Sequence, residues 1–371
     1  MNPVPFFGLH REFEDIREPL MAAVEDVLAS GKLLQGPAVA AFERDVAERA
    51  GRAHAVAVNS CTDALYFGLR ALGVGSGDEV LVTDFSFVAS GTAILRTGAT
   101  PVFVDIDETY SLDLDLADSA VTDRTKALLW VHLFGRMSDA ARVEAFAARH
   151  GLAVLEDAAQ TFGGVRDGRA AGSIGQVSAY SFDPTKVIGA PGSGAVALTD
   201  DEELAAKIRR LHIHGKQGPS FEELGYNAQM STLVAATLLV KLEHEERWLR
   251  RRREIAQLYS EALDGLAVLP ELGSEREHIV HKYVVRTPKR EALQAALTER
   301  DVSTMVHYSY RLHELPLVQG RPHRVVDGGL GDRAKREALS LPIHPYLLDE
   351  ELERITDGIA AFRARADLVA S

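Results

Sequence analysis

The chain has 371 residues, a length that favours two domains over a single hydrophobic core. Its 54 Asp and Glu residues outnumber its 41 Lys and Arg residues, so the net charge is −13. This balance argues against non-specific binding to nucleic acid, which depends on neutralising phosphates, but leaves room for a local basic pocket that binds a small anion. The single cysteine, Cys61, excludes an intrachain disulfide and a thiolate metal cluster.

The first residues and the apolar segments give no sign of export or of membrane attachment. The opening segment, MNPVPFFGLHREF, lacks a basic stretch followed by an apolar core. No apolar run approaches the roughly 20 residues of a membrane span. We therefore expect a cytoplasmic protein that binds neither membranes nor nucleic acid.

Short apolar segments alternate with helical segments through the first 200 residues. Because strands made of continuous apolar residues are buried on both faces, this order predicts a mostly parallel seven-stranded sheet flanked by helices. Ligands of such sheets collect beyond the carboxyl ends of the strands, so we expect the site there. The strand-like segments are HAVAVNS (54–60), DEVLVTD (78–84), TPVFVDID (100–107), ALLWVHLFG (127–135), LAVLEDAAQ (152–160), VSAYSF (177–182) and GAVALTD (194–200).

The pattern changes after about residue 229. Residues 231–263 predict one long helix, and residues 278–288 and 302–310 predict strands on either side of the helix REALQAALTER. A last helix is expected over about 349–366. We therefore divide the α/β chain into a large domain, residues 1–249, and a smaller C-terminal α/β domain, residues 250–371.

One lysine, Lys186, stands between a strand-like run and a glycine-rich loop in SAYSFDPTKVIGAPGSG. A phosphate-binding P-loop is excluded because its lysine follows the glycines, whereas Lys186 precedes them. A dinucleotide-binding loop is excluded because GAPGSG leads into a strand and not into a helix. Taken alone, the segment is as compatible with a hairpin that carries an exposed lysine as with a lysine that has a chemical role.

Two other strand ends favour a chemical role for this lysine. NSCTDAL (59–65) follows a strand and opens a helix, whose first amide groups can bind phosphate or simply be capped by Ser or Thr. EDAAQ (156–160) places carboxylates after another strand, where one could pair with a protonated heterocyclic nitrogen. A lysine, a phosphate cradle and such a carboxylate are the three requirements of pyridoxal phosphate (PLP).

The chain resembles the sugar aminotransferases of the DegT/DnrJ/EryC1/StrS group, which have the type I fold of PLP-dependent transferases. The resemblance covers nearly the whole chain. The motifs that carry it include SGKLLQGPAVAAFE, NSCTDAL, GDEVLVTDFSFVASGTAILRTGATPVFVDID, RTKALLWVHLFG, LEDAAQTFGG, SFDPTK, GYNAQM, VHYSYRLHELP and LSLPIHP.

The resemblance implies a role for each matching residue. Lys186 is expected to be the Schiff-base lysine and the proton shuttle, and Asp157 the partner of the pyridine nitrogen. The remaining cofactor-binding residues implied are Gln160 at the ring hydroxyl, Phe87 stacked on the ring, Cys61, Thr62 and Ser181 at the phosphate, and Asn227 at the phosphate held by the partner subunit of a homodimer. The substrate-binding residues implied are Arg136, His307, Tyr308 and His313.

The sequence departs from the family pattern at four positions. Cys61 stands where the family usually has glycine, and the usual NYRM is NAQM, so that Ala228 and Gln229 replace a tyrosine and an arginine. An arginine there could hold an anionic substrate or the dimer. Arg136, in place of the usual glutamine, could restore a positive charge nearby.

These observations predict a PLP-dependent aminotransferase that acts in two half-reactions. The amino donor is expected to be glutamate or glutamine, and the acceptor a keto-sugar linked to a nucleotide. A cyclitol ketone is the nearest alternative acceptor, and a non-transaminating or regulatory member of the family is the alternative in function. We expect no metal site, because the 13 histidines show no zinc-binding spacing.

Overall fold

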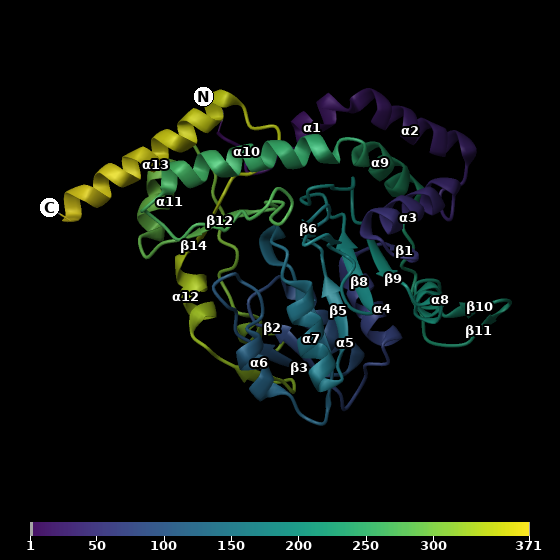
Figure 1. Ribbon diagram of the computed structural model, residues 1–371. Helices are drawn as coiled ribbons and strands as arrows, with labels where there is room; N and C mark the ends of the chain where they lie inside the picture. Colours follow the sequence, from purple (N-terminus) through teal and green to yellow (C-terminus); the bar gives the residue numbers. More distant parts are fainter. Residues whose placement is uncertain (1–2, 371) are drawn as a thin grey trace.

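A mostly parallel sheet forms the centre of the larger part of the chain (Figure 1). The computed structural model describes residues 3–370 of the chain. Strand β9 is antiparallel to both of its neighbours, and the other neighbouring strands are parallel. Within the described residues, the seven expected strands are present and an eighth, β13, joins the edge beside β3. The order across the sheet is β1 (His54–Val58), β9 (Ala195–Thr199), β8 (Val177–Ser181), β5 (Ala153–Asp157), β4 (Thr125–Val131), β2 (Glu79–Thr83), β3 (Thr100–Val104) and β13 (Arg324–Val326).

Helices cover both faces of this sheet, as the continuous apolar strands require. In β2, for example, Val80 and Val82 contact one layer of helices, whereas Leu81 contacts the other. One layer consists of α4 (Cys61–Ala71), α5 (Val88–Thr97) and α8 (Glu202–Leu211). The opposite layer consists of α3 (Pro37–Ala50), α6 (Leu114–Ala120), α7 (Ala140–His150) and α9 (Thr232–Leu242), with α2 (Arg17–Ser30) packed on α9.

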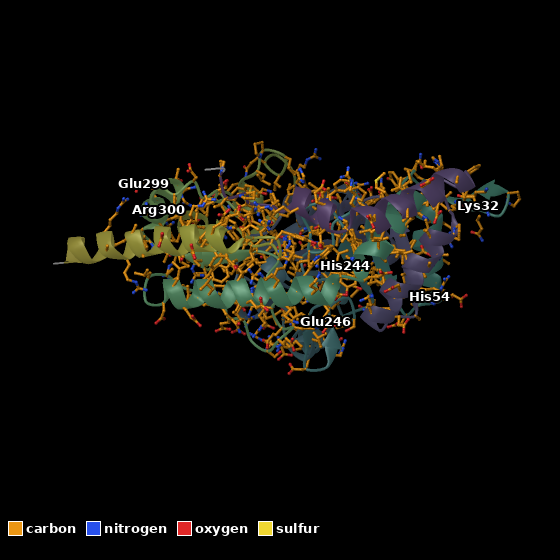
Figure 2. The ribbon with its side chains drawn as sticks, turned by 90° about the horizontal axis from the view of Figure 1, so that it is seen from above. Lys32, His54, His244, Glu246, Glu299 and Arg300 are labelled. Atoms are coloured by element: carbon orange, nitrogen blue, oxygen red, sulfur yellow. The ribbon has the colours of Figure 1, made fainter. Side chains whose placement is uncertain are left out.

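A second hydrophobic cluster forms the core of the C-terminal part. Its antiparallel strands are β12 (Tyr283–Arg286) and β14 (Ala338–Leu341). Figure 2 shows two of its helices, α10 (Glu245–Leu263) and α13 (Asp349–Ala370), lying side by side, with Glu299 and Arg300 just past the end of α11 (Arg290–Thr298). Val4 also belongs to this core and pairs with Val302. The division at residue 249 stays a prediction, because α10 runs through it.

None of the described helices is both long enough and apolar enough to cross a membrane.

Short elements complete the described chain. The remaining elements are α1 (Leu9–Asp15), α12 (Leu330–Glu337), the hairpins β6 (Val165–Arg166) with β7 (Arg169–Ala170) and β10 (Lys216–Gln217) with β11 (Ser220–Phe221), and 3₁₀ turns at Leu133–Gly135 and Leu312–Glu314.

Two elements differ from the sequence-based expectation. The long helix expected over 231–263 is two helices, α9 and α10, which meet at Glu243 and His244. Neither residue is a Gly or Pro, so the sequence has no signal for this break. The strand expected over 302–310 was wrong as well: Val302 pairs with Val4 and Met305 with Ser340 in isolated bridges, and the rest of the segment is irregular.

Buried ion pairs fasten this irregular segment to the large sheet. The Arg311 side chain, 2% exposed, pairs with Asp84 after β2 (Nε to Oδ2, 2.9 Å) and with Asp105 after β3 (Nη2 to Oδ2, 3.7 Å). The Leu312 amide also donates to the Asp84 carbonyl oxygen at 2.8 Å. The residues just before Arg311 are thereby held against the carboxyl ends of the strands.

Candidate active site

A cavity of about 430 Å³ lies beyond the carboxyl ends of β4, β5 and β8, between the large sheet and the C-terminal part. The N-terminus of α4 lines one side of it, and residues from 281 to 308 line another. The predicted site residues that line this cavity are Cys61, Thr62, Phe87, Asp157, Gln160, Ser181, Lys186, His307 and Tyr308. The structure therefore gathers residues from four separate strand ends and from the irregular segment.

A tight turn presents Lys186 to the cavity. The Asp183 side chain accepts hydrogen bonds from the amide (3.1 Å) and the hydroxyl (2.8 Å) of Thr185, and the Asp183 carbonyl accepts one from the Lys186 amide (2.9 Å). A Cβ at Gly189 would lie 2.4 Å from the Pro184 carbonyl oxygen, so the turn requires glycine there. The structure thus decides against an exposed hairpin lysine.

Burial and neighbouring groups act on the pKa of Lys186 in opposite directions. Burial lowers the pKa of Lys186, and the nearby Cys61, Asp157 and Asp183 oppose that change. A lower pKa increases the share of the neutral amine, which is the form that attacks a carbonyl carbon.

The two carboxylates of EDAAQ have different partners. Glu156 accepts hydrogen bonds from the amides of Gly172 and Ile174, both at 2.8 Å, and pairs with His132 at 2.9 Å. These partners are all internal to the fold, so Glu156 is held away from the cavity. Asp157 lines the cavity instead. Burial raises the pKa of the Asp157 carboxyl, and hydrogen bonds donated by the Ala159 amide and the Ser90 hydroxyl oppose that rise.

The N-terminus of α4 provides the candidate phosphate cradle. Ser60 caps the helix by accepting a hydrogen bond from the Asp63 amide at 3.2 Å. The first helical hydrogen bonds run from the Asp63 and Ala64 amides to the Ser60 carbonyl, so the Cys61 and Thr62 amides precede this ladder. They are free to point at an anion, as amides at a helix start do. Capping of the helix by Ser60 and binding of a phosphate by the first amides are therefore compatible here.

Aromatic and amide side chains border the middle of the cavity. Phe87, the N-cap residue of α5, is 51% exposed although it is a large apolar side chain. Gln160 accepts a hydrogen bond from the Phe134 amide at 2.7 Å and donates one to the Tyr308 hydroxyl at 3.4 Å. A flat aromatic ring can lie against Phe87 while polar ring substituents face the Gln160 and Tyr308 side chains.

Three predicted site residues lie outside this cavity. Arg136 lines a neighbouring cavity of about 130 Å³, which Lys282 also lines, and pairs with Glu271 at 2.8 Å. The His313 ring binds the buried Asp84 carboxylate (Nδ1 to Oδ2, 2.6 Å), so it belongs to the Arg311 ion pairs. Asn227 is exposed and pairs with Ile213 through its backbone. Their substrate and cofactor contacts stay predictions.

The structure adds cavity residues that sequence patterns did not single out. His281 and Lys282 lie just before β12, in a segment whose apolar residues predicted only a buried strand. Phe7 comes from the N-terminal segment and Met305 from the irregular one. A lysine within the apolar run HIVHKYVVR was the one available signal. Among the side chains that the structure describes, residues 3–365, no group of three or more His, Cys, Asp or Glu residues is arranged to hold a metal ion.

These residues fit PLP in type and in place. A buried carboxylate (Asp157), a lysine (Lys186), an exposed aromatic ring (Phe87) and the α4 amides surround one cavity. The family model of the DegT/DnrJ/EryC1/StrS aminotransferase family matches residues 14–360. The chain belongs to this family. It is a PLP-dependent aminotransferase with the type I fold, as the sequence predicted.

Curated relatives of this aminotransferase match it over nearly their whole length. A protein of Geobacillus stearothermophilus named pleiotropic regulatory protein is 39% identical over 97% of this chain and 98% of its own. A dTDP-3-amino-3,4,6-trideoxy-alpha-D-glucose transaminase of Streptomyces venezuelae is 38% identical over 98% of this chain and 97% of its own.

Solved structures agree with the fold of the aminotransferase. The S. venezuelae DesV structure in complex with a ketimine intermediate has a TM-score of 0.93 at 38% identity, and covers 98% of this chain and 99% of its own. The Bacillus subtilis NtdA structure with the bound cofactor PMP has a TM-score of 0.89 at 32% identity, and covers 98% of this chain and 85% of its own.

Proposed function

We propose that this aminotransferase moves an amino group from glutamate or glutamine to the ketone of a nucleotide-linked keto-sugar. The observation that carries the proposal is the placement of Lys186 and Asp157 on the wall of one cavity with the start of α4. The names of the S. venezuelae transaminase and of other relatives, such as a UDP-2-acetamido-2-deoxy-3-oxo-D-glucuronate aminotransferase, support a sugar acceptor.

The two substrates use the same cavity in turn, which gives ping-pong kinetics. Bound PLP supplies the electron sink that stabilises negative charge at the substrate carbon. Lys186 would hold the cofactor covalently, and its Nζ would accept and return a proton at the substrate carbon. Asp157 keeps the ring nitrogen protonated through its negative charge, since an adjacent carboxylate favours the charged form of a base. Phe87 and Gln160 orient the ring.

The site is further proposed to be shared between two subunits. Asn227 is exposed and lies outside the cavity of its own chain, which leaves it available to a second copy. A two-fold dimer would then contain two equivalent composite sites. The exposed apolar side chains of Phe221 and Leu224, close to Asn227 in the chain, support an interface at this segment.

One specific observation keeps a second candidate in view. The Geobacillus relative is named as a regulatory protein, and a regulatory member of the family would not need turnover. The presence of Lys186, Asp157 and Gln160 on the cavity wall favours catalysis. A cyclitol ketone remains the nearest alternative acceptor, since it presents a ring ketone without the nucleotide.

A spectral screen tests the proposed function. Glutamate is first used to convert the purified holoenzyme to the amine form of its cofactor, and the donor is removed. A panel of nucleotide-linked keto-sugars and cyclitol ketones is then added. Return of the aldehyde-form absorption with a nucleotide-linked keto-sugar supports the proposal. Return only with cyclitol ketones contradicts the proposed acceptor, and failure of glutamate and glutamine to convert the cofactor contradicts the proposed donor.

A further inference from the structure

A second lysine, Lys282, lies on the wall of the active-site cavity without a counter-ion. Its side chain is 7% exposed, and its ammonium lies 5.9 Å and 5.6 Å from the ring centres of Phe6 and Phe7. Among residues 3–365, whose side chains the structure describes, no carboxylate forms an ion pair with this ammonium and no carbonyl accepts a hydrogen bond from it. A lysine this deeply buried is rarely left unpaired, because the desolvated charge is costly.

The groups that face Lys282 add positive charge to the same place. Burial first, then Lys186 and Arg252, lower the pKa of Lys282 to about 7. The Asp183 carboxylate acts in the opposite direction, but it is already occupied by the Thr185 hydroxyl. His281 and His307 lie beside it on the cavity wall and are neutral, since burial and the lysines lower the pKa of both rings. An anion that enters the cavity here would therefore favour the charged form of Lys282, which only Asp183 supports in the free protein.

Lys282 is also the one cation on this wall that the cofactor does not need. Among the described residues that line the cavity, the lysines and arginines are Lys186 and Lys282. Lys186 is committed to the cofactor, and the phosphate cradle at α4 is formed by a different element. Gln229, at the position where the family usually has arginine, accepts a hydrogen bond from Gln35 at 2.6 Å and does not line the cavity.

We propose that Lys282 is a specificity-determining residue that binds an oxyanion of the substrate, a carboxylate or a phosphate, in the active site. This proposal rests on the proposed function. Both substrates of that reaction carry oxyanions: the amino donor has carboxylates, and the nucleotide-linked acceptor has a diphosphate. A cation that is buried and preorganised binds either group more strongly than an exposed lysine does.

Calorimetric binding of two unreactive probes to the holoenzyme tests the proposal and separates the two sources. Glutarate represents the amino donor without its amine, and uridine or thymidine diphosphate represents the acceptor's nucleotide. The test variant is Lys282→Met, which keeps most of the side-chain volume. The matched control is Lys289→Met, which removes an exposed lysine from the same part of the chain.

Lys282→Met is expected to weaken binding of at least one probe by about 10- to 100-fold, the usual effect of losing a hydrogen bond to a charged group. Loss with glutarate alone identifies the donor carboxylate as the ligand, and loss with the nucleotides alone identifies the diphosphate. Lys289→Met should change neither affinity by more than about twofold, since an exposed charge contributes little. If the wild-type holoenzyme binds neither probe, or if Lys282→Met binds both as wild type does, the proposal is wrong.

A stability measurement separates this role from a structural one. Because the Lys282 ammonium has no counter-ion in the free protein, Lys282→Met should leave the thermal unfolding midpoint unchanged or raise it. A lower midpoint together with weaker binding would assign Lys282 to the fold and overturn the proposal. Neither readout requires turnover, so an inactive wild-type enzyme would contradict the proposed function without deciding the role of Lys282.

Discussion

Replacing Arg311 by methionine should destabilise the protein strongly while changing little of its volume. Arg311 pairs with Asp84 and Asp105, and both carboxylates are fully buried. Methionine removes the shared counter-ion and leaves the two charges inside the protein. The same change releases the segment that carries His307 and Tyr308, so the cavity wall should loosen as well.

The structure sets the size of the expected effect. Removing one partner of a buried ion pair typically costs about 3–5 kcal/mol, because the remaining charge stays desolvated. Asp105 keeps backbone donors at Gly328, Leu330 and Gly331, which limits the loss, so we expect about 3 kcal/mol. That is a large part of a typical stability of about 5–15 kcal/mol.

An exposed arginine in the neighbouring helix provides the control. Arg333 pairs with Glu337 at 3.1 Å, and its side chain is 44% exposed. Arg333→Met should cost at most about 1 kcal/mol, as exposed pairs do. Urea unfolding followed by far-ultraviolet circular dichroism gives the unfolding midpoint of each variant. The midpoints are compared with the same dependence of the unfolding free energy on urea concentration. Equal midpoints for Arg311→Met and Arg333→Met would refute the reasoning.

The loss should also depend on pH. Burial raises the pKa of the Asp105 carboxyl, and Arg311 opposes that rise. Without Arg311 the folded-state pKa should rise further above the unfolded value, so the protonated folded form is favoured at low pH. The stability deficit of Arg311→Met is therefore expected to be smaller at pH 5 than at pH 8, growing as pH rises through the folded-state pKa. A deficit that grows toward low pH would contradict this assignment.

Four further predictions concern the site. Borohydride should fix the cofactor on Lys186 in peptide maps, and Lys186→Ala should abolish turnover; cofactor on another lysine contradicts the assignment. Asp157→Ala should slow both half-reactions by about 10- to 100-fold, as loss of a charged hydrogen bond does, in single-turnover spectra; unchanged rates would leave Asp157 without the proposed role. Calorimetric anion binding that depends on Lys282 should weaken as pH rises through about 7, because the ammonium loses its proton; binding that strengthens over this range opposes it. Mixing Lys186→Ala with Asn227→Asp subunits should restore about a quarter of the sites if Asn227 acts in the partner subunit, and no recovery after proven subunit exchange rules that out.

Much of the large sheet could be predicted from local sequence. The seven segments of continuous apolar residues are strands of one sheet, because such segments are stable when helices cover both of their faces. β13 could not be found in this way, since it has three residues and is held only at its edge beside β3. The break between α9 and α10 was equally hidden, because apolar and polar residues continue through it without a Gly or Pro.

The site was predictable where its residues follow strands, and less so where tertiary contacts position them. Asp157 ends β5, Lys186 lies in the turn after β8, and α4 begins just after β1, so their convergence follows from the order of the strands in the sheet. His313 does not line the cavity, because its ring binds the buried Asp84, and its substrate contact stays a prediction. Lys282 reaches the cavity only because the C-terminal part packs against the sheet, and nothing local to its sequence indicates that packing.

Transfer of labelled nitrogen tests the central claim most directly. The holoenzyme is incubated with [¹⁵N]glutamate, and the mass of the cofactor released from the protein is measured by mass spectrometry. If amino groups pass through a cofactor held at Lys186, the amine form of the cofactor should carry the heavy nitrogen in wild type and should not form at a comparable rate in Lys186→Ala. Absence of the label from the wild-type cofactor, or equal labelling in both proteins, would contradict the account.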